Sequence, residues 1–475
     1  MSWTKRHLPG LSASFQFLQI GFGLMTQTLV LGGGLSGLAS ALLASSRGEE
    51  VTLLEADRVG GKSRRITLEG QTLDTGPAVH SFTNVWKTLL GRIGEQDPLE
   101  HLPWPGLGQH LFRGEKVEFP VRPGGSFYAD WRRYVERQKG IDVAGLLTTP
   151  PRLTNPDFLR MSWGLARAHF PHFTARTYLE SLNLPPLLLE SVAIHALNAG
   201  IGSRYAPALY ASLPALMCEE GLSVPRGGIF ELIRVLKNLC FERGIRIEEG
   251  TPVSRVESGK VWAKRRFWNY DQLINSLDYS RFQALKGGPL STRKRTCSGV
   301  ALYATLEEPL PLPFSSVILP DHPHRLERDL LLAQATDQSM MFVNHYPPHT
   351  VYPENTRAVL SILMTAPADG RSYTLEDGWM GTQLSRLERV LGLPIRSVLR
   401  SSTLLDPQFY SSWGAGGGAI YGDARALWQA GPFHTPPHRL EGKVWQVGTS
   451  AHPGGGIPGV LGSALMVDTL IREGK

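Results

Sequence analysis

Residues 28–61, TLVLGGGLSGLASALLASSRGEEVTLLEADRVGG, constrain the fold of this chain more than any other stretch. A short apolar strand, Thr28–Leu31, runs into a G-x-G-x-x-G spacing, and an alanine- and leucine-rich helix then extends to about Arg47. A second strand, Val51–Leu54, ends on Glu55, an acid 18 residues after the third glycine. This strand–turn–helix–strand order with a following acid predicts a Rossmann-type dinucleotide-binding unit. The glycine spacing alone would also suit a merely tight strand–helix turn.

Each glycine of the spacing has a separate physical task. Gly32 permits the tight turn, Gly34 lets a pyrophosphate approach bare backbone, and Gly37 lets the helix pack closely against the strand. The helix that opens at Leu35 and Ser36 directs free N–H groups and a partial positive charge toward the phosphates. The acid at the end of the second strand is placed to accept hydrogen bonds from a ribose hydroxyl.

A glycine pair, Gly60-Gly61, follows five residues beyond Glu55, and Lys62 comes next. NAD-binding domains do not require such a pair, whereas flavoproteins of the glutathione-reductase type commonly carry E-x-x-x-x-G-G here. Two glycines let the backbone pass close to the second half of a bulky cofactor. The pair therefore favours FAD over NAD, and the turn Leu73–Pro77 follows it.

Length and composition limit the class of protein. At 475 residues, with 42% hydrophobic and 19% charged residues, the chain is long enough for two or more globular domains. Its net charge of +7 suits an ordinary solvated surface or attraction to anionic phospholipid headgroups. No compact basic run or reader motif favours nucleic acid as a partner. Cys218, Cys240 and Cys297 form neither a metal nor a disulfide pattern, as expected in a reducing cytoplasm, and no metal site is expected.

The first residues raise a separate question. Lys5-Arg6 precede the semi-apolar stretch Leu8–Leu24, which resembles a signal peptide only faintly because it contains several polar residues and no convincing cleavage site. No apolar stretch has the length of a transmembrane helix. Met25 stands three residues before the first strand, so we predict that translation starts there and that residues 1–24 are overhang.

The middle of the chain changes in character. Residues 85–215 contain helix-like segments between proline-rich breaks, and their aromatic residues suit either a core or an apolar membrane-facing rim. A helical pattern over residues 230–239 is followed by IRIEEGTPVSRVES, which alternates like a strand pair, and by a strand over Asp271–Leu277. Several strands within residues 296–366 predict a mixed sheet as the floor of a substrate site. The aromatic residues in question are Trp131, Phe158, Trp163, Phe170, Phe173 and Tyr178.

The stretch VWQVGTSAHPGGGIPGVLGSALMVDTLI near the end of the chain is the second informative one. A strand, Val444–Val447, leads into a glycine- and proline-rich loop, His452–Gly459, and then into a helix predicted over Val460–Ile471. Too little chain follows for another strand and acid, so the loop is not a second nucleotide motif. We interpret it as backbone pressed against a flat ring, with the helix dipole aimed at developing negative charge.

Together these motifs give the chain a resemblance to the carotenoid desaturases related to bacterial phytoene desaturase, within the wider flavin amine-oxidase superfamily. The resemblance covers Thr28–Ile471 and rests on VLGGGLSGL, ADRVGG, LDTGPAV, VPRGGIFEL, INSLD, GGAIYGDA and, most specifically, GTSAHPGGGIPGVLGSA. Two features depart from it. Lys62 stands where the family usually has arginine, and the segments LDTGPAVHSFTNVWKTLL and FHTPPHR differ from the phytoene-acting members. The helix around Trp86 looks more like that of 3,4-desaturases, which act late on an acyclic carotenoid end.

The resemblance implies an α/β fold in which a Rossmann-type, glutathione-reductase-like FAD-binding domain is interleaved with an α+β substrate domain. The expected FAD-binding parts are residues 25–84, 216–290 and 421–475, and the substrate domain comprises a helical, membrane-facing part at 85–215 and a mixed sheet at 291–420. The residues expected to contact FAD are Gly32, Gly34, Leu35, Ser36, Gly37, Glu55, Gly60, Gly61, Lys62, Gly76, Pro77, Val253, Gly448, Thr449, Gly459 and Val460.

The implied activity is FAD-dependent desaturation, in which a hydride and a proton leave adjacent carbons of a carotenoid. No residue stands out as the base. His452 and His80 are candidates, and Glu219 and Glu220 are weaker ones. A substrate of about forty carbons would lose on the order of 30 kcal/mol on entering water, at ~0.8 kcal/mol per CH₂. We therefore expect a cytoplasmic enzyme bound peripherally to the inner face of the cell membrane, with homo-oligomerisation left open.

Three other interpretations stay open at this point. The chain could be a phytoene desaturase that forms lycopene, or a flavin amine oxidase that acts on a soluble substrate. It could also be a non-catalytic isoprenoid-binding escort of the same fold. An escort would not need flavin motifs at both ends of the chain, and this sequence has both.

Overall fold

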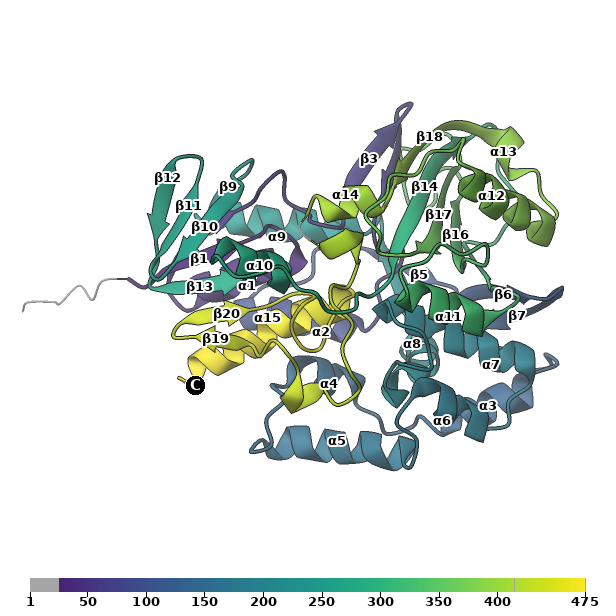
Figure 1. Ribbon diagram of the computed structural model, residues 1–475, viewed down its shortest axis with the longest axis horizontal. Coiled ribbons are helices and arrows are strands. Elements are labelled where there is room, and N and C mark those ends of the chain that lie inside the picture. The colour runs from purple at the N-terminus through teal and green to yellow at the C-terminus, as the bar shows by residue number, and fades with distance from the viewer. Residues whose placement is uncertain (1–24, 414, 475) are drawn as a thin grey trace, which may run out of the picture.

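In the computed structural model, which describes residues 25–413 and 415–474, two large sheets organise the chain. Figure 1 shows the first sheet in the left half of the molecule and the second at the upper right, with a group of helices below them. The predicted start of translation at Met25 concerns residues 1–24, which lie outside the described residues.

The first sheet has the order β19-β20-β13-β1-β2-β9 and is parallel except at its edge strand β19. Its strands come from three distant parts of the chain, which confirms the interleaved Rossmann-type architecture predicted from the sequence. Their bounds are β1 (Gln27–Leu31), β2 (Glu50–Leu54), β9 (Arg246–Glu248), β13 (Gln272–Asn275), β19 (Arg439–Glu441) and β20 (Val444–Gln446).

Helices α1 (Leu35–Ser46), α2 (Thr83–Ile93), α9 (Phe230–Glu242) and α15 (Ile457–Arg472) belong to the same domain. α1 is buried along most of its length between α9 and α15, because its alanines and leucines leave no polar face. The helix ends at Ser46, and Gly48 follows as the expected glycine stop: its φ is +80°, and its amide donates a hydrogen bond to the carbonyl oxygen of Ser45 (2.9 Å).

The strand pair predicted for IRIEEGTPVSRVES is wrong. β9 joins β2 in the first sheet, whereas β10 (Val253–Glu257) joins β11 (Lys260–Ala263) and β12 (Arg266–Asn269) in a separate antiparallel sheet. The intervening turn is fixed to the end of β2, because the amide of Gly250 donates to Asp57 and that of Thr251 donates to Glu55, each at 2.7 Å. The chain therefore cannot fold back on β9.

The second sheet has the order β18-β14-β17-β16-β15-β6-β7. It is the predicted mixed sheet, because β15 pairs with β6 in parallel while its other ladders are antiparallel. β6 (Gly108–Phe112) and β7 (Glu115–Phe119) come from the segment expected to be helical. The other strands are β14 (Ser298–Leu306), β15 (Ser315–Ile318), β16 (Met341–Tyr346), β17 (Val359–Ala366) and β18 (Leu399–Leu405), and α11 (Pro323–Leu331) and α12 (Gly378–Leu391) follow β15 and β17 in the chain.

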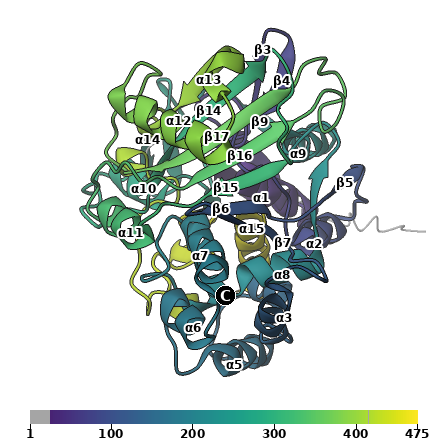
Figure 2. The same ribbon diagram turned by 90° about the vertical axis from the view of Figure 1, so that its right-hand side faces the viewer.

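The helical part of the molecule lies between residues 128 and 220. Its helices are α3 (Tyr128–Glu136), α4 (Val143–Thr148), α5 (Pro156–His169), α6 (Ala175–Ser181), α7 (Pro186–Ala193) and α8 (Leu213–Glu220). Figure 2 shows α5 at the lower end of the molecule, next to α3 and α6. α5 begins where Asn155 caps it, accepting a hydrogen bond of 3.0 Å from the amide of Asp157, with Pro156 in its first turn.

The aromatic residues of this part divide into two groups. Trp131, Phe158 and Tyr178 are buried, whereas Trp163, Phe170 and Phe173 are 68%, 76% and 74% exposed. Within residues 25–413 and 415–474, none of the helices combines the length and the apolar character that crossing a bilayer demands.

Two short ladders connect the two domains. One is the hairpin of β3 (Arg65–Leu68) and β4 (Gln71–Asp74), and the other pairs β5 (His101–Trp104) with β8 (Leu222–Pro225). The chain that leaves β4 runs between the two sheets toward α2, so it carries Gly76, Pro77 and His80 into the region where both domains meet.

Candidate cofactor and substrate site

The turn between β1 and α1 is close-packed at its base and open at its tip. Gly32 has a φ of +94°, and a Cβ on Gly37 would lie 1.9 Å from the carbonyl oxygen of Gly32. Gly34 differs, because the nearest atom to a Cβ there would be the Cα of Gly61, 4.0 Å away. The space beside Gly34 thus lets a pyrophosphate reach the first amide groups of α1.

Glu55 ends β2 with its carboxylate against this turn. Oε2 accepts a hydrogen bond from the amide of Gly33 (2.7 Å), and Oε1 accepts one from the amide of Asp57 (2.9 Å). Both oxygens are therefore fixed in place and keep lone pairs for ribose hydroxyls. Ser276, in the motif INSLD, supports the turn from the other side by donating to the carbonyl oxygen of Leu31 (2.7 Å).

The glycine pair docks on the turn through its backbone. The amide of Gly60 donates to the carbonyl oxygen of Gly33 (2.9 Å), and a Cβ on Gly61 would lie 3.2 Å from the Cα of Gly34. Gly60 and Gly61 have φ values of +128° and +59°, and a Cβ on Gly60 would lie 2.5 Å from the carbonyl oxygen of Ser63. Bare backbone thus forms one wall beside Gly34, as a bulky dinucleotide requires.

Lys62 reaches from this wall to the C-terminal third of the chain, where its Nζ donates to the carbonyl oxygen of Ile420. Burial lowers the pKa of Lys62 to about 8, although the carboxylate of Asp278 opposes the shift. The chain after β4 runs alongside, because a Cβ on Gly76 would lie 2.8 Å from the carbonyl oxygen of Lys62, and the half-buried Pro77 follows. A phosphate placed here would keep this lysine protonated.

The C-terminal loop meets the same turn. Gly448 has a φ of +83°, and its amide donates to the hydroxyl of Ser463 (2.8 Å). A Cβ on Gly448 would lie 2.9 Å from the hydroxyl of Ser36, in the first turn of α1, and Thr449 follows. The two motifs at the ends of the sequence therefore share one location.

The last helix begins earlier than predicted, at Ile457 instead of Val460, because Pro458 fits the first turn of a helix. The amide of Val460 donates to the carbonyl oxygen of Gly456 (3.0 Å), so it is not a free group at the helix end. Gly459 serves close packing, since a Cβ there would lie 2.7 Å from the carbonyl oxygen of Gly454.

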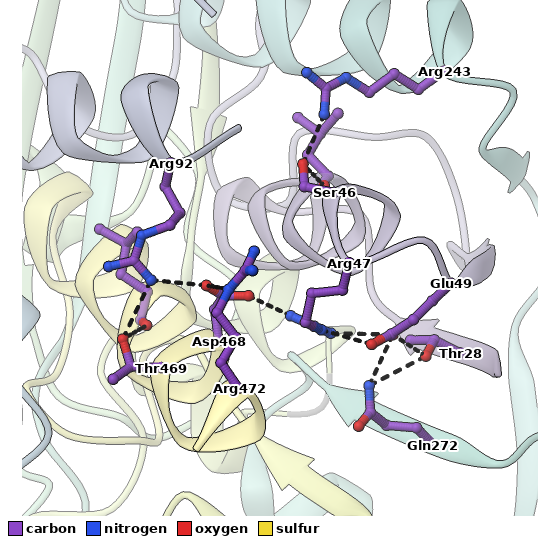
Figure 3. Close-up of polar contacts among 12 residues, drawn as sticks. Thr28, Ser46, Arg47, Glu49, Arg92, Arg243, Gln272, Asp468, Thr469 and Arg472 are labelled. Carbon is purple, nitrogen blue, oxygen red and sulfur yellow. Dashed lines mark hydrogen bonds and ion pairs between the residues drawn. The ribbon is translucent and has the colours of Figure 1, made fainter. Parts of the chain in front are cut away.

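An ion-pair network, drawn in Figure 3, fixes α15 against α1 and α2. The carboxylate of Asp468 is 1% exposed and contacts three guanidinium groups: Arg47, Arg92 at 2.9 Å and Arg472 at 2.8 Å. Arg47 also pairs with Glu49 at 2.6 Å, and Glu49 in turn accepts hydrogen bonds from residues of β1 and β13. The network sets the position of the C-terminal loop relative to the nucleotide turn.

His452, the first candidate base, lies in a basic surrounding. Its ring is 5.8 Å from that of His434, and the loop is held by Arg425, which donates to the carbonyl oxygen of Ser450 (2.8 Å). Burial, together with His438, His434 and Arg425, lowers the pKa of His452 well below its usual value. His434 and His438 both belong to FHTPPHR, so this divergent segment packs on the C-terminal loop.

His80, the second candidate, is fully buried, and neither of its ring nitrogens has a hydrogen-bond partner among the described residues. Its ring lies 6.5 Å from Trp86 and 5.7 Å from His101, which pairs with Asp97 at 2.8 Å. Burial and His101 lower the pKa of His80 to about 4, while Asp97 acts in the opposite direction. Glu219 and Glu220 are exposed at the end of α8.

Two tyrosines beside the site belong to no motif that sequence analysis could recognise. The Tyr303 hydroxyl accepts a hydrogen bond from the amide of Gly76 (3.4 Å), and that of Tyr352 accepts one from the amide of Asp74 (3.1 Å). Both tyrosines reach the site from the substrate domain. Val253 is half-buried at the start of β10, against the apolar cluster that covers β1 and β2.

Across residues 25–413 and 415–474, no group of three or more His, Cys, Asp or Glu side chains is arranged to hold a metal ion. The docked glycine pair and the C-terminal loop both adjoin the turn between β1 and α1. Fold and site together define an FAD-dependent oxidoreductase.

A family model described as an NAD(P)-binding Rossmann-like domain matches residues 30–93. The chain is 21% identical to a 4,4′-diapophytoene desaturase of Staphylococcus haemolyticus, over 94% of this chain and 98% of that protein. It is 24% identical to the 4,4′-diapolycopene oxygenase of a Methylomonas species, over 94% and 98% of the two chains. A zeta-carotene-forming phytoene desaturase of Myxococcus xanthus is 23% identical, over 92% of each.

Among solved structures, putrescine oxidase bound to putrescine matches with a TM-score of 0.65 and 16% identity, over 95% of this chain and 99% of that one. This likeness confirms the flavin amine-oxidase-like fold. The relatives confirm the expected resemblance to the carotenoid desaturases, which extends over nearly the whole chain.

Proposed function

We propose that the protein is an FAD-dependent desaturase that introduces a C=C bond into an acyclic carotenoid at the C-3,4 position. The general activity in this proposal, desaturation of a carotenoid without regard to the bond position, is supported by relatives that match 92–94% of the chain. The FAD contacts expected from Gly32 to Val460, and the division of the chain into FAD-binding and substrate parts, belong to the same proposal.

One observation carries the choice of the C-3,4 position. The two segments that depart from the phytoene-acting members are the helix around Trp86 and FHTPPHR, and each contacts one candidate base: Trp86 contacts His80, and His434 contacts His452. Divergence is thus concentrated beside the groups that would meet the reacting carbons. A different bond position along the polyene is a direct physical reason for such changes.

When bound, FAD supplies the acceptor for the hydride that leaves one carbon. The chain contributes the remainder: amide groups at the start of α1 for the phosphates, Glu55 for the ribose, and bare backbone at Gly61 and Gly448 against the cofactor. Tyr303 and Tyr352, which reach Gly76 and Asp74 from the substrate domain, would help to exclude water. The proton from the adjacent carbon needs a neutral base, and both candidate histidines are neutral at pH 7.

We infer that His80 is that base. Protonated His80 would face Asp97 through His101, and this carboxylate favours the imidazolium form. Protonated His452 would face only His438, His434 and Arg425, all of which disfavour it. His101 and Asp97 are partly exposed, with side chains 23% and 20% accessible, so the surroundings of His80 are open to solvent on this side.

The substrate is insoluble in water, so we propose that the protein binds the inner face of the cell membrane as a peripheral protein. The exposed Trp163, Phe170 and Phe173 lie on and beside α5. Aromatic side chains of this kind are well suited to the interface between headgroups and acyl chains.

The test is expression in two bacterial hosts, one that accumulates lycopene and one that accumulates phytoene, followed by pigment chromatography. We expect 3,4-didehydro products from lycopene. Unchanged lycopene with converted phytoene would instead favour the phytoene desaturase alternative. Purified protein that carries no flavin, or that forms peroxide with amines and leaves both pigments unchanged, would overturn the desaturase proposal.

A further inference from the structure

A charged groove lies outside the cofactor site, between the β6–β7 turn and the starts of α7 and α11. Its cavity has a volume of about 400 Å³, and its charged and imidazole side chains are Arg113, Glu190, His322, His324 and Arg325. We call it the basic groove. The mechanism proposed above uses none of these residues.

The groove holds more positive charge than its acids neutralise. Arg113 donates twice to the carbonyl oxygen of Asp321, at 3.1 and 2.6 Å, and has no carboxylate within 4.0 Å among the described residues. Arg325 has only long contacts, 3.6 Å to Asp329 and 3.5 Å to Asp337. The one acid on the wall, Glu190, is already paired with Arg176 at 2.8 Å.

A further guanidinium group contacts one of the residues that line the groove. Arg204 lies 2.9 Å from a ring nitrogen of His324, and within residues 25–413 and 415–474 it too forms no ion pair with a carboxylate. Burial, with Arg204 and Arg176, lowers the pKa of His324, and the carboxylates of Glu190 and Glu327 oppose this shift without cancelling it. An anion in the groove would reverse this shift.

The basic groove adjoins the exposed aromatic residues. Residues 203–208 run beside residues 173–176, through the bond from the amide of Arg176 to Ser203 (3.0 Å) and that from Ala208 to Phe173 (3.0 Å). Tyr205, next to Arg204, is 41% exposed. Figure 2 shows α11 next to α7, with α6 below them and α5 at the lower end of the molecule.

We propose that the basic groove binds the phosphate group of an anionic phospholipid at the edge of the membrane contact. Planar guanidinium groups match phosphate oxygens in charge and geometry, and the neighbouring aromatic rings would enter the headgroup region of the same lipid layer. The inference rests on the proposed function, because a carotenoid must be drawn from a membrane, and it adds which lipid the protein prefers.

The experiment measures co-sedimentation of the FAD-loaded full chain with phosphatidylcholine vesicles, with and without phosphatidylglycerol. We expect phosphatidylglycerol to strengthen binding, and the variant Arg113→Gln/Arg204→Gln to lose at least roughly tenfold of that binding, since each basic residue near a charged membrane contributes measurably. The matched control is Arg266→Gln/Arg389→Gln, which removes two exposed arginines from β12 and α12. Equal thermal unfolding of both variants would show that each is folded.

Equal losses of vesicle binding in both variants would show that only the net charge of the protein matters. Unchanged binding in the groove variant would show that the groove is not a lipid site. Either result overturns the inference. Millimolar inorganic phosphate that shifts the His324 NMR signals, without any dependence of binding on phosphatidylglycerol, would assign the groove to a soluble anion and also overturn it. Pigment conversion is measured in parallel. Pigment conversion without a preference for phosphatidylglycerol would contradict only this inference. A preference for phosphatidylglycerol without pigment conversion would contradict only the proposed function.

Discussion

The amide of Gly60 donates a hydrogen bond of 2.9 Å to the carbonyl oxygen of Gly33, which joins the glycine pair to the nucleotide turn. The carboxylate of Glu55 binds the amide of the same Gly33 at 2.7 Å, so one peptide segment is held from both sides. The glycine turn, the acid Glu55 and the glycine pair are separate in the sequence, and in the structure they form one unit. This unit is open at Gly34, where the nearest atom to a Cβ would be 4.0 Å away, and the first prediction follows from that opening.

Gly34→Ala should lower FAD retention and leave the fold intact, because the new methyl group meets no atom closer than 4.0 Å but occupies the approach of the pyrophosphate. Gly37→Ala should destabilise the protein itself, since its Cβ would lie 1.9 Å from the carbonyl oxygen of Gly32. The measurements are the flavin-to-protein absorbance ratio and the thermal unfolding midpoint. Gly91→Ala, in α2 with no atom within 4 Å, is the control and should be neutral or more stable by about 1 kcal/mol. A Gly34→Ala protein that keeps its FAD would contradict the site.

Lys62 should make FAD binding to the apoprotein depend on pH. Its pKa of about 8 in the folded protein lies below the usual lysine value of 10.5, so the cation that attracts the phosphates is lost as pH rises through 8. Unfolded chains still bind that proton up to pH 10.5, so the same residue makes the empty protein more stable between these values as pH rises. Reconstitution titrations between pH 7 and 9 should show weakening affinity. Lys62→Arg, which stays protonated, should flatten the dependence; an unchanged slope would count against the assignment.

Asp468→Asn should destabilise the protein by about 3–5 kcal/mol, because a buried group that compensates three guanidiniums would lose its charge. The variant should also release FAD more readily, since α15 carries the C-terminal loop. Urea unfolding and flavin retention test the two effects. Arg472→Gln is the matched control: its side chain is 39% exposed, and its loss should cost at most about 1 kcal/mol. Similar losses in the free energy of unfolding in both variants would show that the network contributes no more than an exposed ion pair does.

His80→Asn should lower turnover by about 10²–10⁴-fold while the flavin stays bound, as removal of a general base does. In the native protein the rate should be independent of pH above about 5 and fall as pH approaches 4, where His80 becomes protonated. Product formation with purified protein in carotenoid-loaded vesicles gives both results. His452→Asn serves as the comparison, and a larger loss there than in His80→Asn would move the role of base to the C-terminal loop.

Contiguous signals in the sequence predicted structure well. Thr28–Leu31, the helix to Arg47 and Val51–Leu54 each agree with the structure to within a residue, because propensity, glycine placement and periodicity all coincide there. The last helix starts three residues before its predicted position, because the prolines and glycines of the loop hide a helix start that Pro458 in fact favours.

Features that depend on contacts between distant segments could not be predicted. The sequence 245–258 alternates as a strand pair does, and only the bonds from Gly250 and Thr251 to the end of β2 separate its two strands. Trp131 and Phe173 look alike in the sequence, yet one is buried and the other exposed. The contact of Ser36 with Gly448, and the basic groove assembled from several segments of the chain, likewise arise from tertiary packing.

The order of strands in the first sheet has a consequence for biosynthesis. β20 pairs with β13, and α15 packs on α1, so the sheet and the cofactor pocket are incomplete until residues 444–472 have left the ribosome. A nascent chain therefore exposes the apolar side of α1 until residues 457–472 have emerged, and its cofactor site is complete only from then on. Cofactor loading in this sense waits for a segment that is made long after the nucleotide turn.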